Sequence, residues 1–372
     1  MTVLFDNARD IDGAPLWLLV DGTQFVAVGS SDAPDANTRV DLGGRVVTPG
    51  FVDLHAHGAG GHGYDNGPDE MRAGLAVHRA HGTTRSLVSL VANPLATLRT
   101  SLATIAELAA EDPTVLGSHL EGPFLAPDRR GAHNLDFLRA PEPADVDALL
   151  EAAAGTLRLV TLAPELPGAM EAIDAFVAAG VTVAVGHTEA SFELAREAFD
   201  RGATMLTHAF NAMPGIHHRA PGPVVAAFED ERVTLEIILD GQHVHPDVAA
   251  LAFHSAPGRI ALVTDAMAAA GSTDGDYTLG SLTVSVVDGL AVLRGTSTIA
   301  GSTLTQDAAL RLALARTSVA PAAVVAALSS TPAHAIGLGT RFGMLAADYT
   351  ADFVVLTDDL TVDEVWVAGS RL

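Results

Sequence analysis

The feature that most constrains this chain is a pair of histidines, His55 and His57, which ends an apolar run over residues 46–54. Side chains alternate across a strand, so these two rings point the same way, about 6.6 Å apart along the backbone. Two imidazoles placed in this way can close on one cation. The chain has 15 histidines, and either ring could instead be a hydrogen-bonded core residue, so the pair alone leaves metal binding open.

The middle of the chain alternates between short apolar runs, which we interpret as strands, and Ala-rich amphipathic stretches long enough for crossover helices. The predicted strands are 51–55, 84–90, 115–120, 157–162, 181–186, 204–208, 233–239 and 259–264. The predicted helices include 94–111, 144–154, 168–179, 189–200 and 246–255. Eight such units predict an α/β fold of the (β/α)8 TIM-barrel type. A doubly wound open sheet is the alternative, because periodicity does not report closure.

Both ends of the chain have a different sequence pattern. Short apolar runs, such as 16–20 and 353–356, are separated by predicted turns. This pattern is typical of small antiparallel sheets. We therefore expect the two termini to pair into one small β domain. The predicted boundaries are 1–48 and 341–372 for that domain and 49–340 for the barrel.

Composition narrows the possible partners. With 21 basic and 45 acidic residues the net charge is −24, which repels phosphate backbones and anionic lipids, so neither nucleic acid nor a membrane is expected as a partner. Cysteine is absent, which excludes thiolate metal sites and a cysteine nucleophile. The first residues lack the pattern of an export signal, and no apolar run approaches membrane-spanning length, so a cytoplasmic location is expected.

Five of the eight predicted strands end in a histidine or an acidic residue. These strand-end residues are His55, His57, His119, Glu121, His187, His208 and Asp265. A closed barrel brings such positions together around one mouth. Imidazole and carboxylate ligands suit zinc and similar divalent ions, so the sequence predicts a metal site there. The chain contains no lysine that could be carboxylated to bridge two ions, which leaves Glu121 as the best bridge.

Several of these motifs carry a family resemblance. Residues 49–57 resemble the amidohydrolase superfamily, and five further segments are similar to the N-acetylglucosamine-6-phosphate deacetylases. Those segments are 119–124, 131–134, 186–188, 207–213 and 262–266, and the similarity continues to 332–337, so nearly the whole chain is covered. The resemblance implies a barrel with a small β-sandwich domain, a homodimer, and a metal-dependent hydrolase that acts in amino-sugar catabolism and cell-wall sugar recycling.

The resemblance also implies a primary metal site formed by Glu121, His187 and His208. Because this chain has both first-strand histidines, His55 and His57, two ions are favoured, although a weakly occupied second site is equally compatible. Zn²⁺ is the expected ion, with Fe²⁺, Mn²⁺ and Co²⁺ as alternatives.

The implied reaction is hydrolysis of the acetamide of N-acetyl-D-glucosamine 6-phosphate to D-glucosamine 6-phosphate and acetate. An amide needs a strong nucleophile, stabilisation of its carbonyl oxygen and a proton for the leaving nitrogen. We expect Asp265 to take the proton of the attacking water and return it to the amine, and His133 to stabilise the carbonyl oxygen together with the metal. Asp265 could instead be only a ligand, or have both roles.

The phosphate needs cationic donors, which are scarce in so acidic a chain. Arg219, whose planar fork matches phosphate oxygens, and His243, which follows the seventh strand, are the candidates. The family resemblance suggests that they are contributed by the neighbouring subunit, which would place the site near the interface. Arg129 and Arg130 are interpreted as a solvated turn or a lid. The other substrate-binding residues implied by the resemblance are Ala132, His133, Asn211, Ala212, Thr298, Ile299 and Ala300.

Three rivals remain at this stage. A cyclic-amide hydrolase of the dihydroorotase kind is disfavoured by the absence of lysine. A deacetylase for N-acetylgalactosamine 6-phosphate differs by the stereochemistry of one hydroxyl, which the sequence does not resolve. A catalytically dead barrel that serves as an assembly module is disfavoured because such proteins usually lose ligands, and here all are present together with Asp265.

Overall fold

A computed structural model describes all residues 1–372, and eight parallel strands form its centre. They are β6 (Phe51–Asp53), β9 (Thr83–Leu90), β10 (Val115–Glu121), β11 (Leu157–Leu162), β12 (Thr182–Val185), β13 (Met205–Leu206), β14 (Thr234–Ile238) and β15 (Ile260–Val263). Each predicted strand is confirmed, with ends that differ by at most two residues. The sheet closes just beyond β6 and β15, where the His57 N–H donates to the Ala266 carbonyl and the Asp265 N–H to the His55 carbonyl, both at 2.7 Å.

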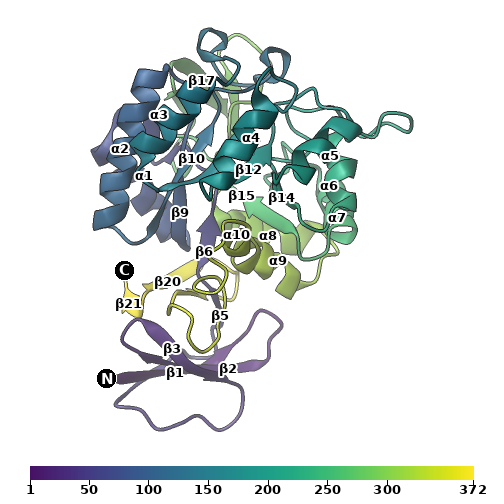
Figure 1. The fold of residues 1–372 in the computed structure, drawn as a ribbon. Helices are drawn as coiled ribbons and strands as arrows, with labels where there is room; N and C mark the ends of the chain where they lie inside the picture. Colours follow the sequence, from purple (N-terminus) through teal and green to yellow (C-terminus); the bar gives the residue numbers. More distant parts are fainter.

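Helices surround this barrel and bury their apolar faces against it (Figure 1). Helix α2, for example, buries Leu98, Leu102, Ile105 and Leu108, which share one face at helical spacing. The helices are α1 (Pro68–Ala80), α2 (Leu95–Glu111), α3 (Pro143–Ala153), α4 (Ala169–Ala178), α5 (Phe192–Asp200), α6 (Gly222–Glu229), α7 (Pro246–Ser255), α8 (Gln306–Arg316), α9 (Pro321–Leu328) and α10 (Ser330–Ala335). The five helices predicted from the sequence are confirmed. No helix is both long and apolar enough to cross a membrane.

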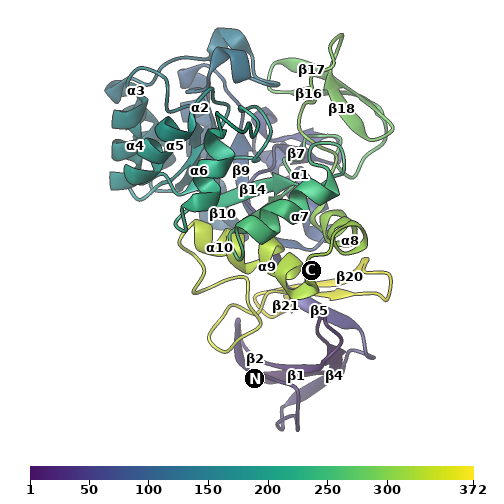
Figure 2. The same cartoon turned by 90° about the vertical axis from the view of Figure 1, so that its right-hand side faces the viewer.

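The two termini form a second sheet at one end of the barrel, drawn at the bottom of Figures 1 and 2. Phe5, Phe25 and Phe353 pack in its own small core, separate from that of the barrel. This confirms the small β domain built from both ends, whereas its exact boundaries stay a prediction. Its strands are β1 (Thr2–Arg9), β2 (Pro15–Asp21), β3 (Gln24–Gly29), β4 (Thr38–Asp41), β5 (Val46–Pro49), β19 (Phe353–Leu356), β20 (Val362–Val367) and β21 (Ser370–Arg371).

A buried ion pair ties this domain to the base of the barrel. Arg85 of β9 donates from Nε and Nη2 to the two carboxylate oxygens of Asp352, at 2.6 and 2.9 Å, and both side chains are buried. Asp352 also accepts from the Ala368 N–H at 2.8 Å. Every carboxylate oxygen of this pair is therefore satisfied.

Small additional elements lie near the opposite end, and the sequence analysis assigned them no structure. A three-stranded antiparallel sheet of β16 (Gly275–Leu279), β17 (Leu282–Val287) and β18 (Leu290–Leu293) follows the last barrel strand and appears at the upper right of Figure 2. Its buried residues, including Leu279 and Val284, pack against Met267 just beyond β15. The remaining elements are the hairpin β7 (Gly58–Ala59) and β8 (His62–Gly63), and the 3₁₀ turns at Tyr64–Asn66, Pro127–Arg129 and Leu135–Phe137.

Candidate active site

The strand-end residues meet at one mouth of the barrel, as the sequence predicts. Glu121 is the last residue of β10, and His187, His208 and Asp265 each follow their strand by two residues. These last three adopt positive φ angles of 47°, 27° and 46°, in a region that residues other than glycine rarely occupy. Such conformations cost on the order of 1–3 kcal/mol each and tend to cluster at functional sites. The strained turns aim these side chains back over the mouth.

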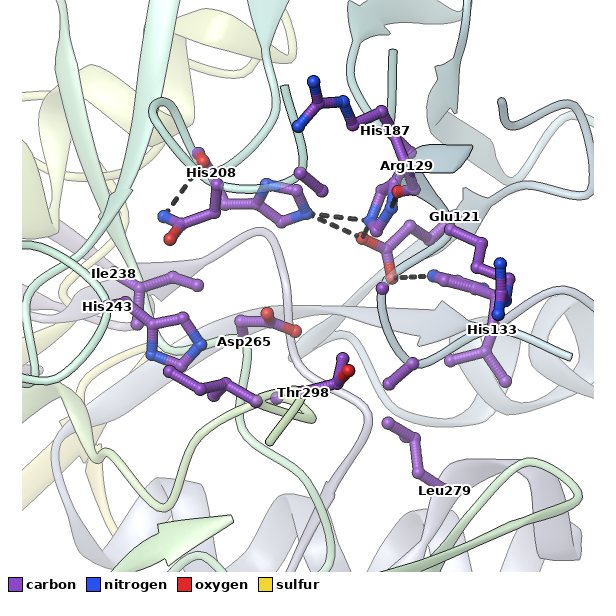
Figure 3. A pocket seen from close by; sticks show the side chains of 18 of the residues that line it. Glu121, Arg129, His133, His187, His208, Ile238, His243, Asp265, Leu279 and Thr298 are labelled. Atoms are coloured by element: carbon purple, nitrogen blue, oxygen red, sulfur yellow. Dashed lines mark hydrogen bonds and ion pairs between the residues drawn. The ribbon is translucent and has the colours of Figure 1, made fainter. Parts of the chain in front are cut away.

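One cluster joins Glu121 to the two histidines of the predicted primary site (Figure 3). Glu121 Oε1 lies 3.0 Å from His187 Nε2 and 3.2 Å from His208 Nε2, and the two nitrogens are themselves 3.0 Å apart. His187 Nδ1 donates to the Arg129 carbonyl at 2.7 Å, which leaves the lone pair on Nε2. Two imidazole nitrogens that face one carboxylate oxygen fit a divalent ion as their common partner.

A second cluster lies on the other side of the same carboxylate. His55 Nε2 and His57 Nε2 are 3.1 Å apart. His57 Nε2 also lies 3.2 Å from Glu121 Oε2 and 3.3 Å from Asp265 Oδ1. One ligand atom from each of these four residues lies within 4.8 Å of all the others. The geometry therefore suits a second ion with Glu121 as the bridge.

Electrostatics within the second cluster show how strongly it favours positive charge. Burial disfavours the charged form of His57, but hydrogen bonds to Asp265 and Glu121 outweigh burial and raise the pKa of His57 to about 9. Burial likewise raises the pKa of Asp265, but His55 and His57 outweigh it and hold that pKa below its usual range. A divalent cation would satisfy the same carboxylates more completely than protons on the imidazoles.

His119, two residues before the end of β10, is not part of either cluster. Its Nδ1 lies 2.9 Å from Ser89 Oγ and its Nε2 2.9 Å from Thr161 Oγ1, so both nitrogens are satisfied. Burial, together with the nearby His55, holds the pKa of His119 well below its usual value. This residue is a hydrogen-bonded core histidine.

His133 reaches the mouth from the loop after β10. Its Nδ1 accepts from the Ala92 N–H at 3.1 Å, which places the ring proton on Nε2. That Nε2 lies 3.3 Å from Glu121 Oε2 and points into the cavity, as Figure 3 shows. His133 is therefore held as a hydrogen-bond donor beside both clusters.

A cavity of about 470 Å³ opens above the clusters. Most predicted substrate residues line it: Ala132, His133, Asn211, Ala212, His243, Thr298 and Ile299. Ala300 is fully buried beside this wall without lining it. Arg219 is exposed on the loop over residues 214–221 and does not line the cavity of its own chain, so its role stays a prediction.

Three apolar residues of the cavity wall had no predicted role. Val91, Ile238 and Leu279 supply apolar surface, and the sequence offers no signal for them beyond hydrophobicity. Arg129 and Arg130 line the entrance, and Arg129 is ion-paired with the exposed Glu189. The interpretation of these two arginines as a solvated turn or a lid stays a prediction.

His243 brings positive charge to the wall opposite His133 (Figure 3). Its Nδ1 lies 2.7 Å from Asp240 Oδ2, and both side chains are largely buried. Burial disfavours the charged ring, but Asp240 outweighs burial and raises the pKa of His243. A protonated His243 can receive an anionic group of a ligand.

Comparison with known proteins agrees with this geometry. A model of the amidohydrolase family matches residues 46–372. An N-acetylgalactosamine-6-phosphate deacetylase of Escherichia coli O157:H7 is 40% identical over 330 residues, covering 87% of each chain, and an N-acetylglucosamine-6-phosphate deacetylase of Danio rerio is 36% identical, covering 91% of this chain and 87% of its own.

Among solved structures, the complex of a variant N-acetyl-D-glucosamine-6-phosphate deacetylase from Mycobacterium smegmatis with N-acetyl-D-glucosamine-6-phosphate superposes with a TM-score of 0.94. It is 42% identical and the match covers 100% of this chain and 98% of the other. The deacetylase from Thermotoga maritima superposes with a TM-score of 0.89 at 28% identity, covering 99% of both chains.

Proposed function

Because this chain belongs to the amidohydrolase family, we propose that it hydrolyses the acetamide of N-acetyl-D-glucosamine 6-phosphate to D-glucosamine 6-phosphate and acetate. The observation that carries this proposal is the position of Glu121. Its Oε1 faces His187 and His208, and its Oε2 faces His57 and His133. Asp265 lies beside them and also lines the cavity. The reaction would serve amino-sugar catabolism and cell-wall sugar recycling.

The donor set fits divalent metal, and we propose Zn²⁺ as the ion. Three residues, Glu121, His187 and His208, whose ligand atoms lie within 3.2 Å of one another, would hold the first ion. His55 and His57 with Glu121 and Asp265 would hold a second. When bound, such an ion polarises the amide carbonyl and lowers the pKa of a coordinated water to about 7. Only imidazole and carboxylate donors are available, a set that zinc accepts readily.

The protein's own residues account for the proton transfers. Asp265 Oδ1, at the cavity floor, takes a proton from the attacking water as the new C–O bond forms. It then gives that proton to the amide nitrogen as the C–N bond breaks, so the carboxylate is regenerated and free amine leaves. His133 donates its Nε2–H to the carbonyl oxygen while charge develops there.

The phosphate of the substrate would lie toward His243, whose raised pKa favours the imidazolium form. Asn211 and the Ala212 N–H line the same wall. Arg219 of the same chain lies outside this cavity, so in the proposed arrangement it would reach the phosphate only from a second subunit, and otherwise it is an ordinary surface arginine. In the proposed arrangement the site would be shared across a homodimer interface.

The second candidate substrate is N-acetyl-D-galactosamine 6-phosphate, because a relative that is 40% identical bears that name. The two sugars differ only at the 4-hydroxyl, and the acetamide chemistry is the same. For either substrate we propose a cytoplasmic location, since sugar phosphates are charged and do not cross membranes unaided.

Acetate release from both phosphorylated sugars and from free N-acetyl-D-glucosamine tests the proposal. We expect rapid turnover of at least one 6-phosphate and much slower turnover of the free sugar. Absence of acetate release from every substrate, with metal bound, would refute the function.

A further inference from the structure

Glu236 is a buried carboxylate to which the reaction described above gives no task. It lies in the middle of β14, whose sequence Thr-Leu-Glu-Ile-Ile is otherwise apolar apart from its first residue, and it is 0% exposed. Burying a carboxylate in the interior is unfavourable unless it is paired and hydrogen-bonded. A residue of similar size such as leucine would fill the same space without that cost, so the choice of glutamate calls for a reason.

One oxygen of Glu236 contacts ligands of both metal clusters from beneath. Its Oε2 lies 3.2 Å from His55 Nδ1 and accepts the backbone N–H of His208 at 3.3 Å. The other oxygen, Oε1, is buried and has no hydrogen-bond partner. Glu236 therefore contacts a ring of the second cluster and the backbone of the first, and one of its two oxygens is left without a partner.

This contact decides which nitrogen of His55 can bind a cation. A carboxylate at Nδ1 holds the ring proton on that atom, so the lone pair lies on Nε2. That Nε2 faces the ligand set, 3.4 Å from both Glu121 Oε1 and Asp265 Oδ1. A carboxylate behind a ligating histidine also makes the imidazole a stronger donor.

The other ligating histidines lack such support. The Nδ1 atoms of His57 and His208 are buried without any hydrogen-bond partner, and His187 Nδ1 donates to a backbone carbonyl. His55 is thus the one ring of the four that is backed by a carboxylate. This difference among the four rings should strengthen cation binding at the second cluster, to which His55 belongs.

We propose that Glu236 is a positioning residue which, by fixing the tautomer of His55, allows the second cluster to hold its own divalent ion. This inference rests on the proposed two-ion arrangement. Glu236 touches neither the cavity nor the substrate, so its effect passes entirely through His55 and the bound ion.

The test uses the full-length protein and titrates Zn²⁺ against a chelator, with elemental analysis for stoichiometry, in wild type, Glu236→Leu and Glu236→Gln. We expect Glu236→Leu to weaken the second ion about 10- to 100-fold, the range typical for loss of such a partner, while the first ion stays within threefold. Glu236→Gln keeps an acceptor oxygen but no charge, so its second ion should be weakened at least threefold and less than in Glu236→Leu.

Glu165→Gln is the matched control, since Glu165 braces Thr188 beside the primary cluster without contacting an imidazole. It should leave both affinities unchanged. Glu236→Leu leaves the His208 N–H and His55 Nδ1 without their acceptor, so the stability of the metal-free protein should fall. The readout that a merely structural role would not move is therefore the split between the two ion affinities, with the second weakened and the first retained.

The outcomes separate the two proposals. If wild type binds only one ion, the two-ion arrangement fails and this role fails with it. If wild type binds two ions and Glu236→Leu binds both with wild-type affinity, or loses both in parallel while still folded, the role of Glu236 alone is wrong. Should Glu236→Leu not fold, an unchanged second affinity in Glu236→Gln would overturn the inference by itself.

Discussion

The two ends of the barrel both bury charged groups, but they treat them differently. At the base, Arg85 and Asp352 form a complete two-pronged pair that joins the barrel to the small domain. At the mouth, Glu121 and Asp265 crowd against five imidazoles, three of the residues involved have strained backbone angles, and some buried nitrogens have no partner. The contrast teaches that the base is built for stability, whereas the mouth stores an electrostatic imbalance that a bound cation relieves.

The largest effect on activity is expected from a substitution of Asp265 at the mouth. Asp265→Asn removes the proton acceptor but keeps the shape, so kcat/KM for acetate release should fall by at least about 1,000-fold, roughly 4 kcal/mol. The ion at Glu121, His187 and His208 should remain, as measured by elemental analysis, and thermal stability should not fall. Near-normal turnover would refute the assignment of Asp265.

A substitution at the base of the barrel should lower stability and leave activity unchanged, the opposite of the effect expected at Asp265. Arg85→Met leaves Asp352 buried without its partner, which should lower the free energy of unfolding by about 3–5 kcal/mol in urea. Activity per folded molecule at low temperature should stay near that of wild type. Arg72→Met is the control, because its pair with Glu111 is exposed and should contribute less than about 1 kcal/mol. Equal losses in the two variants would contradict the distinction between buried and exposed pairs.

A third prediction concerns His78, a buried histidine near the mouth that has no carboxylate partner and so should make stability depend on pH. His78 of α1 donates from Nε2 to the Gly58 carbonyl, and burial lowers the pKa of His78 to about 4. The unfolded chain, with a pKa near 6.5, binds the proton first as pH falls. Stability should therefore decline from pH 6.5 to 4 by about 3 kcal/mol from this residue and level off below pH 4.

Denaturant midpoints measured across that pH range check this expectation. His78→Gln keeps a donor for Gly58 but does not titrate, so its curve should be flatter than that of wild type. His254→Gln, at an exposed position, should retain the wild-type slope. Identical slopes in all three proteins would show that His78 does not carry the effect.

The smallest effect is expected at Arg219, which lies outside the cavity of its own chain. Arg219→Ala should reduce the preference for the phosphorylated over the free sugar by about tenfold, roughly 1.4 kcal/mol, as loss of one phosphate contact. Competition kinetics on the two sugars measure this preference, and an unchanged preference in Arg219→Ala would show that Arg219 has no role in phosphate binding.

Subunit mixing tests whether Arg219 acts across a dimer interface. Mixing Arg219→Ala with a catalytically dead Asp265→Asn partner should then restore part of the preference.

Much of the barrel follows from the sequence because local patterns and chemistry agree there. The eight strands are short buried apolar runs, and the ligands stand at their carboxyl ends, where a parallel barrel must gather them. The sheet of β16–β18 was not predicted, although β17 alternates apolar Leu282, Val284 and Val286 with polar Thr283 and Ser285, the pattern of a half-buried strand.

The roles of side chains that act through other residues also could not be predicted from the sequence. Glu236 is visible there only as a charge in an apolar run, and its contact with His55 joins positions 181 residues apart. The position of Arg219 relative to a substrate depends on assembly, which no pattern within one chain reports. By contrast His55 and His57 could be placed together from their spacing of two residues, although β6 itself ends at Asp53 and the isolated bridge of Ala56 to Ala266 holds the segment between them.

The proposed catalysis requires residues far apart in the sequence to converge on a cation. A crystal structure of the zinc-loaded protein, with anomalous scattering recorded at the zinc edge, tests this most directly. The expected result is a strong anomalous peak within bonding distance of Glu121, His187 and His208, with a second peak beside His55 and His57. Full zinc content with no peak between Glu121, His187 and His208 would contradict it.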